Sequence, residues 1–414
     1  MKSNHPKSKI LNHRSKPKVF VGLSGGVDSS VSAALLKKEG FDVTGVFIKA
    51  WTPEGYPCTW KEDRRSAMRA AAILDIPFIT LDLEKEYKKE IVDYMIREYR
   101  EGNTPNPDVL CNKEIKFGHF LDFALKSGAD FVATGHYAQK LKAKSLELRA
   151  KKINLKASSS QLQAPSYALS EAEDKNKDQS YFLWTLRPDQ LRHILFPIGH
   201  LQKSEVRKLA EKFGLPQATR KDSQGLCFLG QVDMKEFLSR YIKPKKGDVL
   251  NGNGEIIGEH PGAFFFTIGE RHGFTITKKS PEDSPLYVVS KDIKNNTITV
   301  APNQKAKPEK NVMKKVWPSL PKASEETRGL FEEYFYQVLL SSVNWIEGKT
   351  PETDKEYFAR IRYRQEKIKC KIKIEKGIVY VLFKQKPWGL SSGQSLVLYE
   401  ADKMLGGGVI AQSA

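Results

Sequence analysis

Cysteines are few and long apolar runs are missing from this sequence of 414 residues. Its four cysteines are too few and too widely spaced for a disulfide framework or a zinc site built on paired cysteines. No apolar run approaches the roughly 20 residues that span a bilayer. We therefore expect a cytoplasmic protein without membrane contact, in a reducing compartment.

Basic residues are the group that the chain has in excess. It carries 68 lysines and arginines against 49 acidic residues, which gives a formal net charge of +19. Such a charge attracts polyanions at long range, so nucleic acid is the expected partner, although a solvated lysine-rich surface would give the same balance. Residues 1–18 hold basic but no acidic residues and are predicted to form a disordered arm.

Short apolar runs alternate with helical patterns through the first third of the chain. Such alternation predicts parallel strands with right-handed crossovers, which is a doubly wound α/β sheet. We place this domain at 19–225, with a hairpin insertion at 141–173. Glycine-rich turns and short alternating runs then predict two smaller β-rich domains, at 226–293 and 294–414. The expected strands are 19–23, 43–48, 77–81 and 131–134, and the expected helices include 84–99, 113–127 and 188–195.

The first apolar run ends at Leu23 and leads into the loop SGGVDSS at residues 24–30, which opens a helix. Backbone N–H groups converge at such a helix start, so phosphate is the expected ligand. Gly25 and Gly26 let the backbone approach an anion closely. A Walker loop has lysine where this loop has Asp28, which we expect to hold Mg²⁺ through water. The loop resembles that of the PP-loop ATP pyrophosphatases, an adenine nucleotide alpha hydrolase-like fold whose members cleave ATP between its α- and β-phosphates.

The segment NTPNPDVLCNKEIKFG places Cys111 at the predicted start of a helix. The helix dipole and the nearby Lys113 and Lys116 would favour its thiolate, as a reactive cysteine requires. Asp108 would serve as a general acid or base if it faced the same cavity, although a capping or turn role for aspartate is as common. The segment therefore predicts a reactive thiol with a carboxyl group nearby.

A second cysteine, Cys227, follows a glycine in DSQGLCFLG, in a loop expected between two domains. Sulfur transfer needs a persulfide carrier and a second thiol that attacks it, and Cys227 and Cys111 are sufficient for this. Cys370 alternates with isoleucines on one face of a predicted strand, so it belongs in a core. Cys58 is interpreted as a bystander.

Several longer motifs share one resemblance. They are PNPDVLCNKEIKFG, TGHYA at 134–138, NKDQSYFLW at 176–184, DSQGLCFLG, RYRQ at 362–365, GLSSGQSLVLY at 389–399 and LGGGVI at 405–410. Together, in this order, they resemble the tRNA-specific 2-thiouridylase family, and the likeness spans residues 19–411. The chain departs from the family pattern in its basic arm and near 150–165 and 320–338, which touch none of these motifs.

The resemblance implies a particular reaction. ATP would adenylylate the 2-carbonyl of the wobble uridine in the anticodon stem-loop of a tRNA, and a persulfide would displace AMP to leave 2-thiouridine, AMP and pyrophosphate. Cys227 would carry the persulfide, delivered by a sulfur-relay protein, while Cys111 would release the sulfur and close a transient disulfide with Cys227. Asp108 would be the acid or base, and ATP and Mg²⁺ would be the cofactors.

The resemblance also implies binding residues. Those for ATP are Gly22, Leu23, Ser24, Gly25, Gly26, Val27, Asp28, Ser29, Ile48 and Gly135. Those for tRNA are Asn106, Pro107, Asp108, Lys177, Asp178, Gln179, Arg362, Tyr363 and Arg364. No resident metal is predicted, because His119 and His136 have no second ligand at a suitable spacing.

Two alternatives stay open at this point. A PP-loop amidotransferase or synthetase acting on a small nucleotide would use the same loop, but it would leave Cys111 and the basic β domains without a purpose. A non-catalytic RNA-binding relative would keep the fold and the charge, but the intact Ser24, Asp28, Cys111 and Cys227 argue against it.

Overall fold

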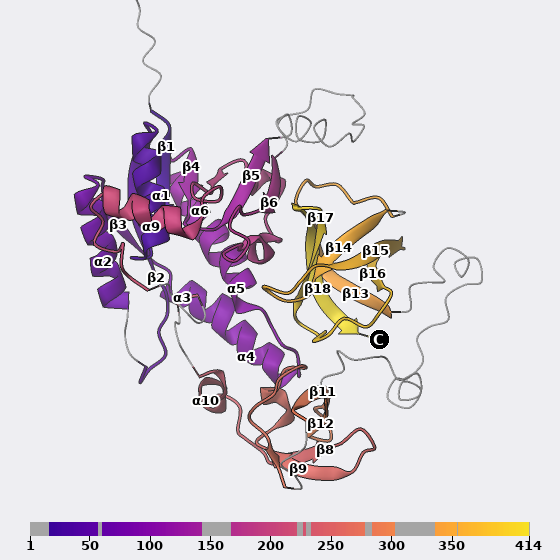
Figure 1. The fold of residues 1–414 in the computed structure, drawn as a ribbon. Helices are drawn as coiled ribbons and strands as arrows, with labels where there is room; N and C mark the ends of the chain where they lie inside the picture. Colours follow the sequence, from indigo (N-terminus) through magenta and orange to yellow (C-terminus); the bar gives the residue numbers. More distant parts are fainter. Residues whose placement is uncertain are drawn as a thin grey trace, which may run out of the picture.

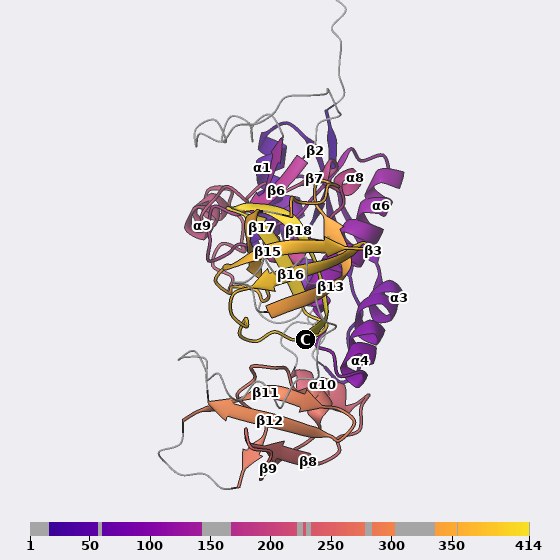
Figure 2. The same cartoon turned by 90° about the vertical axis from the view of Figure 1, so that its right-hand side faces the viewer.

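The computed structural model describes residues 16–56, 60–142, 167–221, 227–228, 233–277, 284–302, 336–353 and 355–413. Most of the basic arm, Cys58, the middle of the predicted hairpin and most of the segment near 320–338 lie outside these residues. Figure 1 shows a helix-rich N-terminal part with a barrel-like C-terminal part beside it. A small β part lies at one end of the molecule in both views (Figures 1 and 2).

A five-stranded parallel sheet, in the order β3-β2-β1-β4-β7, supports the N-terminal part. Its strands are β1 Lys18–Gly22, β2 Asp42–Lys49, β3 Phe78–Asp82, β4 Phe131–Ala133 and β7 Ile194–Leu195. The predicted doubly wound α/β fold is confirmed, but the helix expected at 188–195 is wrong in its second half. There α8 (Pro188–Leu191) ends and β7 follows. The strand order reverses between β1 and β4, and such sheets bind ligands at the carboxyl ends of the strands beside this point.

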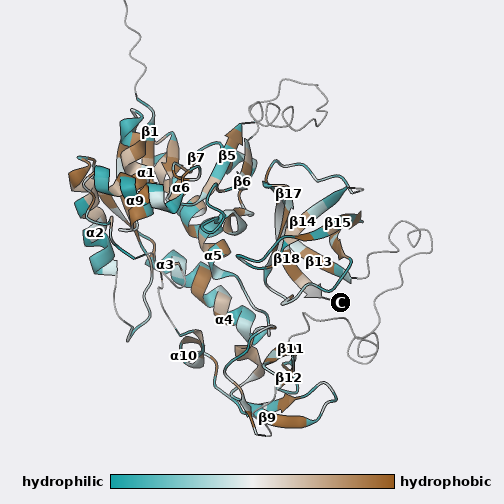
Figure 3. Ribbon diagram, viewed as in Figure 1, coloured by the Kyte–Doolittle hydropathy of each residue, from teal (hydrophilic) through white to brown (hydrophobic). Residues whose placement is uncertain are grey.

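The sheet has a hydrophobic core on each face because buried residues alternate along its central strand. Val19 and Val21 of β1 belong to one core, and Phe20 belongs to the other. The helices packed on the Val19 face are α1 Val27–Lys38, α2 Trp60–Ile73 and α9 Lys203–Lys212. Figure 3 shows hydrophobic and hydrophilic bands along α2 and α9, whose buried residues lie on one face.

Two long helices on the other face each contain a π-helical segment. The first joins α3 Glu84–Tyr87, η1 Lys88–Val92 and α4 Asp93–Arg100, and the second joins α5 Pro107–Leu110, η2 Cys111–His119 and α6 Phe120–Lys126. The second begins at Pro107, not at the predicted residue 113. Asn106 caps it by accepting a hydrogen bond from Val109 N at 3.3 Å, and proline suits the first helical position. Cys111 therefore lies one turn inside the helix.

The C-terminal part is a sheet closed on itself, since β13 pairs with both β16 and β18. Its strands are β13 Tyr336–Trp345, β14 Glu356–Arg360, β15 Ile368–Glu375, β16 Ile378–Phe383, β17 Ser395–Glu400 and β18 Lys403–Ser413. The strands of the predicted hairpin, β5 (Ala138–Lys142) and β6 (Tyr167–Glu171), continue this sheet because β6 pairs with β18. The hairpin thereby attaches the barrel to the α/β part. Cys370 is fully buried in the barrel core, as predicted.

The small β part is a five-stranded sheet in the order β10-β9-β8-β12-β11. It follows α10 Met234–Ser239 and contains β8 Gly247–Leu250, β9 Ile256–His260, β10 Thr275–Ile276, β11 Leu286–Asp292 and β12 Thr297–Pro302. Because β12 pairs with β8 and β11, this sheet runs past the boundary suggested at 293. Within the described residues, no helix is long and apolar enough to cross a membrane.

Candidate active site

The glycine-rich loop lies where the sheet topology predicts a ligand, between the end of β1 and the start of α1. Gly25 has a φ of +80°, and a Cβ on it would lie 2.3 Å from the backbone oxygen of Asp63. A side chain there would therefore displace the loop or α2. The hydroxyls of Ser24 and Ser29 are 3.2 Å apart, and the Ser29 hydroxyl also accepts from Ser24 N at 3.2 Å. The loop is thus held compactly at a helix N-terminus, as a phosphate site requires.

Three further side chains, which no sequence motif predicted, hold the loop in place. Ser66 Oγ and Arg220 Nη1 each donate to the backbone oxygen of Gly25 at 2.9 Å. Arg220 also forms an ion pair with Asp63. Gln217 Nε2 donates to the backbone oxygen of Ser66 at 2.7 Å and to its hydroxyl at 3.0 Å. Arg220 and Gln217 are far in sequence from what they bind, so no local pattern signals these contacts.

The TGH motif follows β4 and lies against the loop. A Cβ on Gly135 would lie 2.6 Å from Ser29 N and 2.8 Å from the carbonyl carbon of Asp28. The Asp28 carboxylate accepts from Lys203 Nζ at 2.7 and 2.8 Å and from the Tyr137 hydroxyl at 2.9 Å. Lys203 and Tyr137 are therefore further residues of the nucleotide region that the motif alone did not reveal.

Three other residues implied for ATP binding are buried in the hydrophobic cores. Leu23 is 1%, Val27 4% and Ile48 6% exposed. Their side chains pack against other apolar groups, so we expect them mainly to support the loop and the end of β2. Among the described residues, no three His, Cys, Asp or Glu side chains gather as a metal site would require.

The structure brings Asp108, Cys111 and Cys227 together. Cys111 is fully buried on η2 and Cys227 is half-buried, and the two free thiols are close enough to shift each other's pKa although 116 residues separate them. Asp108 Oδ1 accepts from Cys227 N at 2.9 Å, and the Tyr87 hydroxyl donates to the backbone oxygen of Cys227 at 2.6 Å. Tyr87 was not predicted. The two thiols and the carboxyl group therefore meet at one point, as a sulfur transfer that ends in a disulfide between the two cysteines requires.

The surroundings of the two thiols shift their pKa values in opposite directions. Burial, with the neighbouring Cys227, raises the pKa of Cys111 well above its ordinary value. The hydrogen bond with Cys111, together with the positive charge of Lys116, lowers the pKa of Cys227 against the effect of burial. Burial raises the pKa of the Asp108 carboxyl, although Cys227 N and Lys116 oppose it. Cys227 is therefore the thiol that ionises first.

The expectation that the helix start would favour the Cys111 thiolate is wrong. The helix begins a turn earlier, and loss of water around Cys111 outweighs the helix dipole. Lys113 is half exposed and its Nζ lies 2.8 Å from Glu114 Oε1, so it belongs to the surface. Of the two lysines that were predicted to lie near Cys111, Lys116 therefore remains as the one beside the thiols.

Comparisons with known proteins agree with this geometry. Residues 17–231 match the family described as tRNA methyl transferase HUP domain, 235–302 match its PRC-barrel domain, and 336–410 match the aminomethyltransferase beta-barrel domain. The tRNA-specific 2-thiouridylase MnmA of Nitrosomonas europaea is 40% identical over 403 residues, which cover 96% of this chain and 99% of that protein. The same enzymes of Streptococcus thermophilus and Geobacillus thermodenitrificans are each 39% identical, over 97% and 95% of this chain and 97% and 94% of theirs. This chain belongs to the tRNA-specific 2-thiouridylase family.

Membership of the family confirms three predictions: the PP-loop α/β fold followed by β-rich parts, the enzyme class of tRNA sulfurtransferase, and tRNA 2-thiolation as the reaction. A synthetase acting on a small nucleotide does not fit such matches over nearly the whole chain. Family membership does not assign roles to individual residues. Their burial and contacts in the structure are described next.

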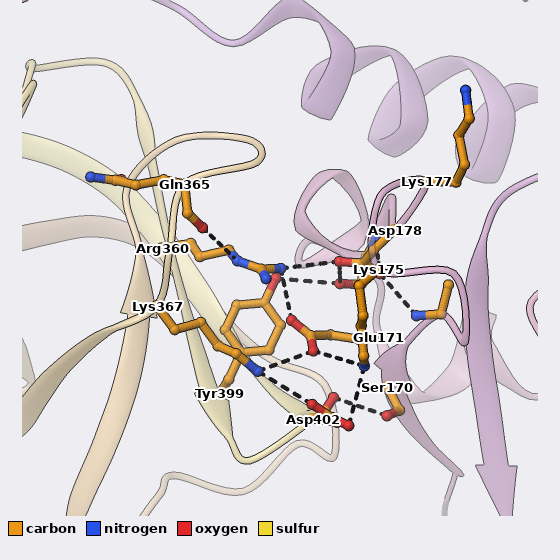
Figure 4. Close-up of polar contacts among 12 residues, drawn as sticks. Ser170, Glu171, Lys175, Lys177, Asp178, Arg360, Gln365, Lys367, Tyr399 and Asp402 are labelled. Atoms are coloured by element: carbon orange, nitrogen blue, oxygen red, sulfur yellow. Dashed lines mark hydrogen bonds and ion pairs between the residues drawn. The ribbon is translucent and has the colours of Figure 1, made fainter.

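The loop that carries Lys177, Asp178 and Gln179 leads from β6 into a short helix at Ser180–Leu183. Asp178 is only 5% exposed and accepts from backbone N–H groups of its own loop, while Gln179 Oε1 accepts from the backbone N of Tyr137 at 3.1 Å. In Figure 4 the Lys177 side chain points away from Asp178. We therefore expect Asp178 and Gln179 to shape this loop and Lys177 to face tRNA.

The barrel residues that the resemblance implies for tRNA binding also fall into two groups, one with a structural role and one with side chains suited to tRNA. Arg362 is mostly buried and donates to the backbone oxygen of Ile268, so it ties the barrel to the small β part. The ring of Tyr363 packs on Phe182 with centroids 4.5 Å apart, and the Arg364 guanidinium lies 5.1 Å from the centre of the Tyr363 ring. Tyr363 and Arg364 offer a ring and a cation that suit a base and a phosphate.

A group of charged side chains joins the Asp178 loop to the barrel (Figure 4). We call Glu171, Asp178, Arg360, Lys367 and Asp402 the interdomain ion cluster. Glu171, which is 1% exposed, lies 2.7 Å from Arg360 Nη1 and 3.0 Å from Lys367 Nζ. Arg360 Nη1 also lies 3.1 Å from Asp178 Oδ2, and Lys367 Nζ lies 3.4 Å from Asp402 Oδ1. Two cations thus bridge carboxylates that come from both parts.

Replacing Arg360 by methionine should lower the free energy of unfolding by about 3–5 kcal/mol, because it leaves the buried Glu171 and Asp178 without their shared cation. Urea unfolding of the full chain measures this loss. The matched control is Arg187→Met, which removes an exposed pair with Asp189 worth at most about 1 kcal/mol. A loss in Arg360→Met no larger than in the control would show that the cluster does not hold the loop to the barrel.

Proposed function

We propose that this chain activates the 2-carbonyl of the wobble uridine of tRNA with ATP and replaces its oxygen with a sulfur atom carried on Cys227. The observation that carries the proposal is the meeting of Asp108, Cys111 and Cys227 in the α/β part that also holds the glycine-rich loop. A family that thiolates tRNA needs both an activating site and a sulfur carrier, and these residues are suited to each role.

The loop from Ser24 to Ser29 would bind the phosphates of ATP, since its backbone N–H groups lie at the N-terminus of α1. Asp28 would hold Mg²⁺ together with phosphate oxygens, a donor set of carboxylate and phosphate that this cation prefers. The ion would neutralise phosphate charge. Lys203, already bound to Asp28, is placed to share that charge compensation.

The sulfur half of the reaction would begin with the anionic persulfide on Cys227. Its terminal sulfur attacks C2 of the adenylated uridine, the C2–O bond breaks, and AMP leaves with the bonding electrons. The Cys111 sulfur then attacks Cys227 Sγ, which forms the Cys111–Cys227 disulfide and leaves the transferred sulfur on C2 as the thiocarbonyl. A thiol reductant must afterwards restore both cysteines.

Asp108 would take the proton that Cys111 gives up when it attacks. Burial raises the pKa of this carboxyl, so it holds a proton more readily than an exposed aspartate. The partial exposure of Cys227 gives a persulfide-bearing protein access to load it. The target base would be reached more easily in a single-stranded anticodon loop, where extruding it costs little stacking.

Incubation with ATP, Mg²⁺, a protein persulfide donor and unmodified tRNA tests the proposal through nucleoside analysis for 2-thiouridine. We expect 2-thiouridine with AMP and pyrophosphate in equal amounts, and none when a tRNA with wobble cytidine replaces the substrate. A protein that binds tRNA without releasing pyrophosphate would support the non-catalytic alternative. Thiolation without AMP release would refute the adenylate.

A further inference from the structure

We propose that Lys116 is a further catalytic residue, whose ammonium group holds the reacting sulfur of Cys227 as an anion, and that His136 positions it. The inference rests on the proposed function, because it assumes that Cys227 carries the transferred sulfur. It adds a residue to the reaction that neither the ATP loop nor the two-cysteine scheme contains.

The winding of the helix brings Lys116 to the thiols. Cys111 and Lys116 both lie in η2, which is π-helical over Cys111–His119, and backbone hydrogen bonds there join residues five apart. In an α-helix, residue i+5 would point about 140° away from residue i. The wider π turn brings positions i and i+5 closer to one face, so Cys111 and Lys116 both reach Cys227.

The contacts of Lys116 place a cation at the reacting sulfur. Its Nζ lies 5.8 Å from the centre of the ring of Phe228, the residue next to Cys227, and its positive charge acts to lower the pKa of the Cys227 thiol. The titratable groups that face Cys227 are Cys111, Asp108, Tyr87 and Lys116. Within the described residues, Lys116 is the group of this set that carries positive charge.

His136 fixes the ammonium from the other side. Its Nε2 lies 3.5 Å from Lys116 Nζ, and its Nδ1 lies 2.7 Å from Thr134 Oγ1. Burial and the charge of Lys116 lower the pKa of His136 well below its ordinary value, so the ring is neutral. Because Lys116 can only donate, Nε2 is the acceptor and Nδ1–H donates to Thr134.

The surroundings of His136 keep this arrangement rigid. Its ring packs against Phe117 and Phe196, with centroids 5.8 and 6.2 Å apart. Thr134 and His136 flank Gly135, which touches the ATP loop. The position of Lys116 is therefore set by the same three-residue motif that supports the nucleotide loop.

Lys116 suits this position because it stays protonated beside the sulfur of Cys227. Burial acts to lower the pKa of Lys116, but the sulfurs of Cys227 and Cys111 and the Asp108 carboxylate outweigh it and raise that pKa. The ammonium therefore keeps its proton while Cys227 loses its own, and the pair stays complementary through loading and transfer. The lowered pKa of Cys227 therefore leaves a larger share of its sulfur anionic near neutral pH than in an isolated thiol.

The pH dependence of Cys227 alkylation tests the inference on the full chain without any tRNA. Iodoacetamide is used at a series of pH values, and mass spectrometry reads the rate at Cys227 alone. In Lys116→Met the midpoint should rise by about one pH unit or more, with roughly tenfold slower alkylation at pH 7. Lys116→Arg should restore the midpoint most of the way, since it keeps the charge.

The matched control is Lys113→Met, which removes the same charge from the exposed side of the same helix. It should leave the alkylation midpoint and the rate of thiolation unchanged. His136→Leu should move the midpoint in the same direction as Lys116→Met, by a smaller amount. Single-turnover thiolation in Lys116→Met should fall on the order of 10²-fold, with tRNA affinity retained.

An unchanged midpoint in a folded Lys116→Met chain would overturn the inference, and so would equal shifts in Lys116→Met and Lys113→Met. The outcome is separable from that of the proposed function. If the wild-type chain alkylates with a lowered midpoint that depends on Lys116 but never thiolates tRNA, the sulfur-transfer scheme fails while the pairing of Lys116 with Cys227 stands.

Discussion

Replacing Cys227 by serine should abolish 2-thiouridine formation while tRNA-dependent pyrophosphate release continues. Serine cannot carry a persulfide, so thiolation should fall by a factor on the order of 10³ or more. The ATP loop lies between β1 and α1, and no contact of Cys227 described above reaches it. The measurement pairs nucleoside analysis with pyrophosphate release from one reaction, so that activation and sulfur transfer are read separately.

Cys111→Ser should abolish thiolation at a different step. Cys227 can still be loaded and its persulfide can still attack C2. Mass spectrometry should therefore find one added sulfur atom on Cys227 before tRNA is supplied, and after reaction a Cys227–tRNA adduct joined through that sulfur, with no disulfide between the two positions. Cys370→Ala is the control, because Cys370 lies in the barrel core and Cys111 lies in a separate hydrophobic core, and it should keep thiolation. Activity retained in either Cys111→Ser or Cys227→Ser would end the two-thiol scheme. Serine at both positions should still bind tRNA as the wild-type chain does.

The fold was largely predictable because its signals are local. Each buried strand of the α/β sheet is a short apolar run between turns, and alternation with helices fixes a parallel arrangement. The errors have local causes as well. The helix was predicted from residue 113, yet a proline at the first helical position with Asn106 before it starts the helix at Pro107. The two residues of β7 were too few to show a pattern.

The site was predictable only in part. Motifs located the cysteines and the loop, but their acidities depend on burial and on neighbours that are distant in sequence. The same is true of Tyr87, Lys203 and Arg220, which contact residues more than 100 positions away. Asp178 shows the reverse case, since a polar residue in a matched motif is buried in the interdomain ion cluster. A motif identifies a residue as functionally or structurally important, but it does not show which contact that residue makes.

Gly135→Ala should impair both halves of the reaction, unlike Cys227→Ser. The added methyl group would lie 2.6 Å from Ser29 N, closer than packed atoms tolerate, so the ATP loop must move. Displacing a positioned phosphate site by about 1 Å costs on the order of 10²-fold in rate. We therefore expect pyrophosphate release and thiolation to fall together by about that factor, with a raised KM for ATP.

Gly252→Ala is the matched control, because a Cβ at Gly252 meets no atom within 4 Å. It should leave both reactions and the KM for ATP unchanged. The comparison of Gly135→Ala with Cys227→Ser also shows which step comes first. A defect at the ATP loop must slow thiolation as well, because sulfur attacks only an activated carbonyl. A defect at Cys227 leaves pyrophosphate release unchanged. Pyrophosphate release that survives Gly135→Ala while thiolation is lost would mean that the TGH motif serves the sulfur site through His136 and Lys116, not the nucleotide.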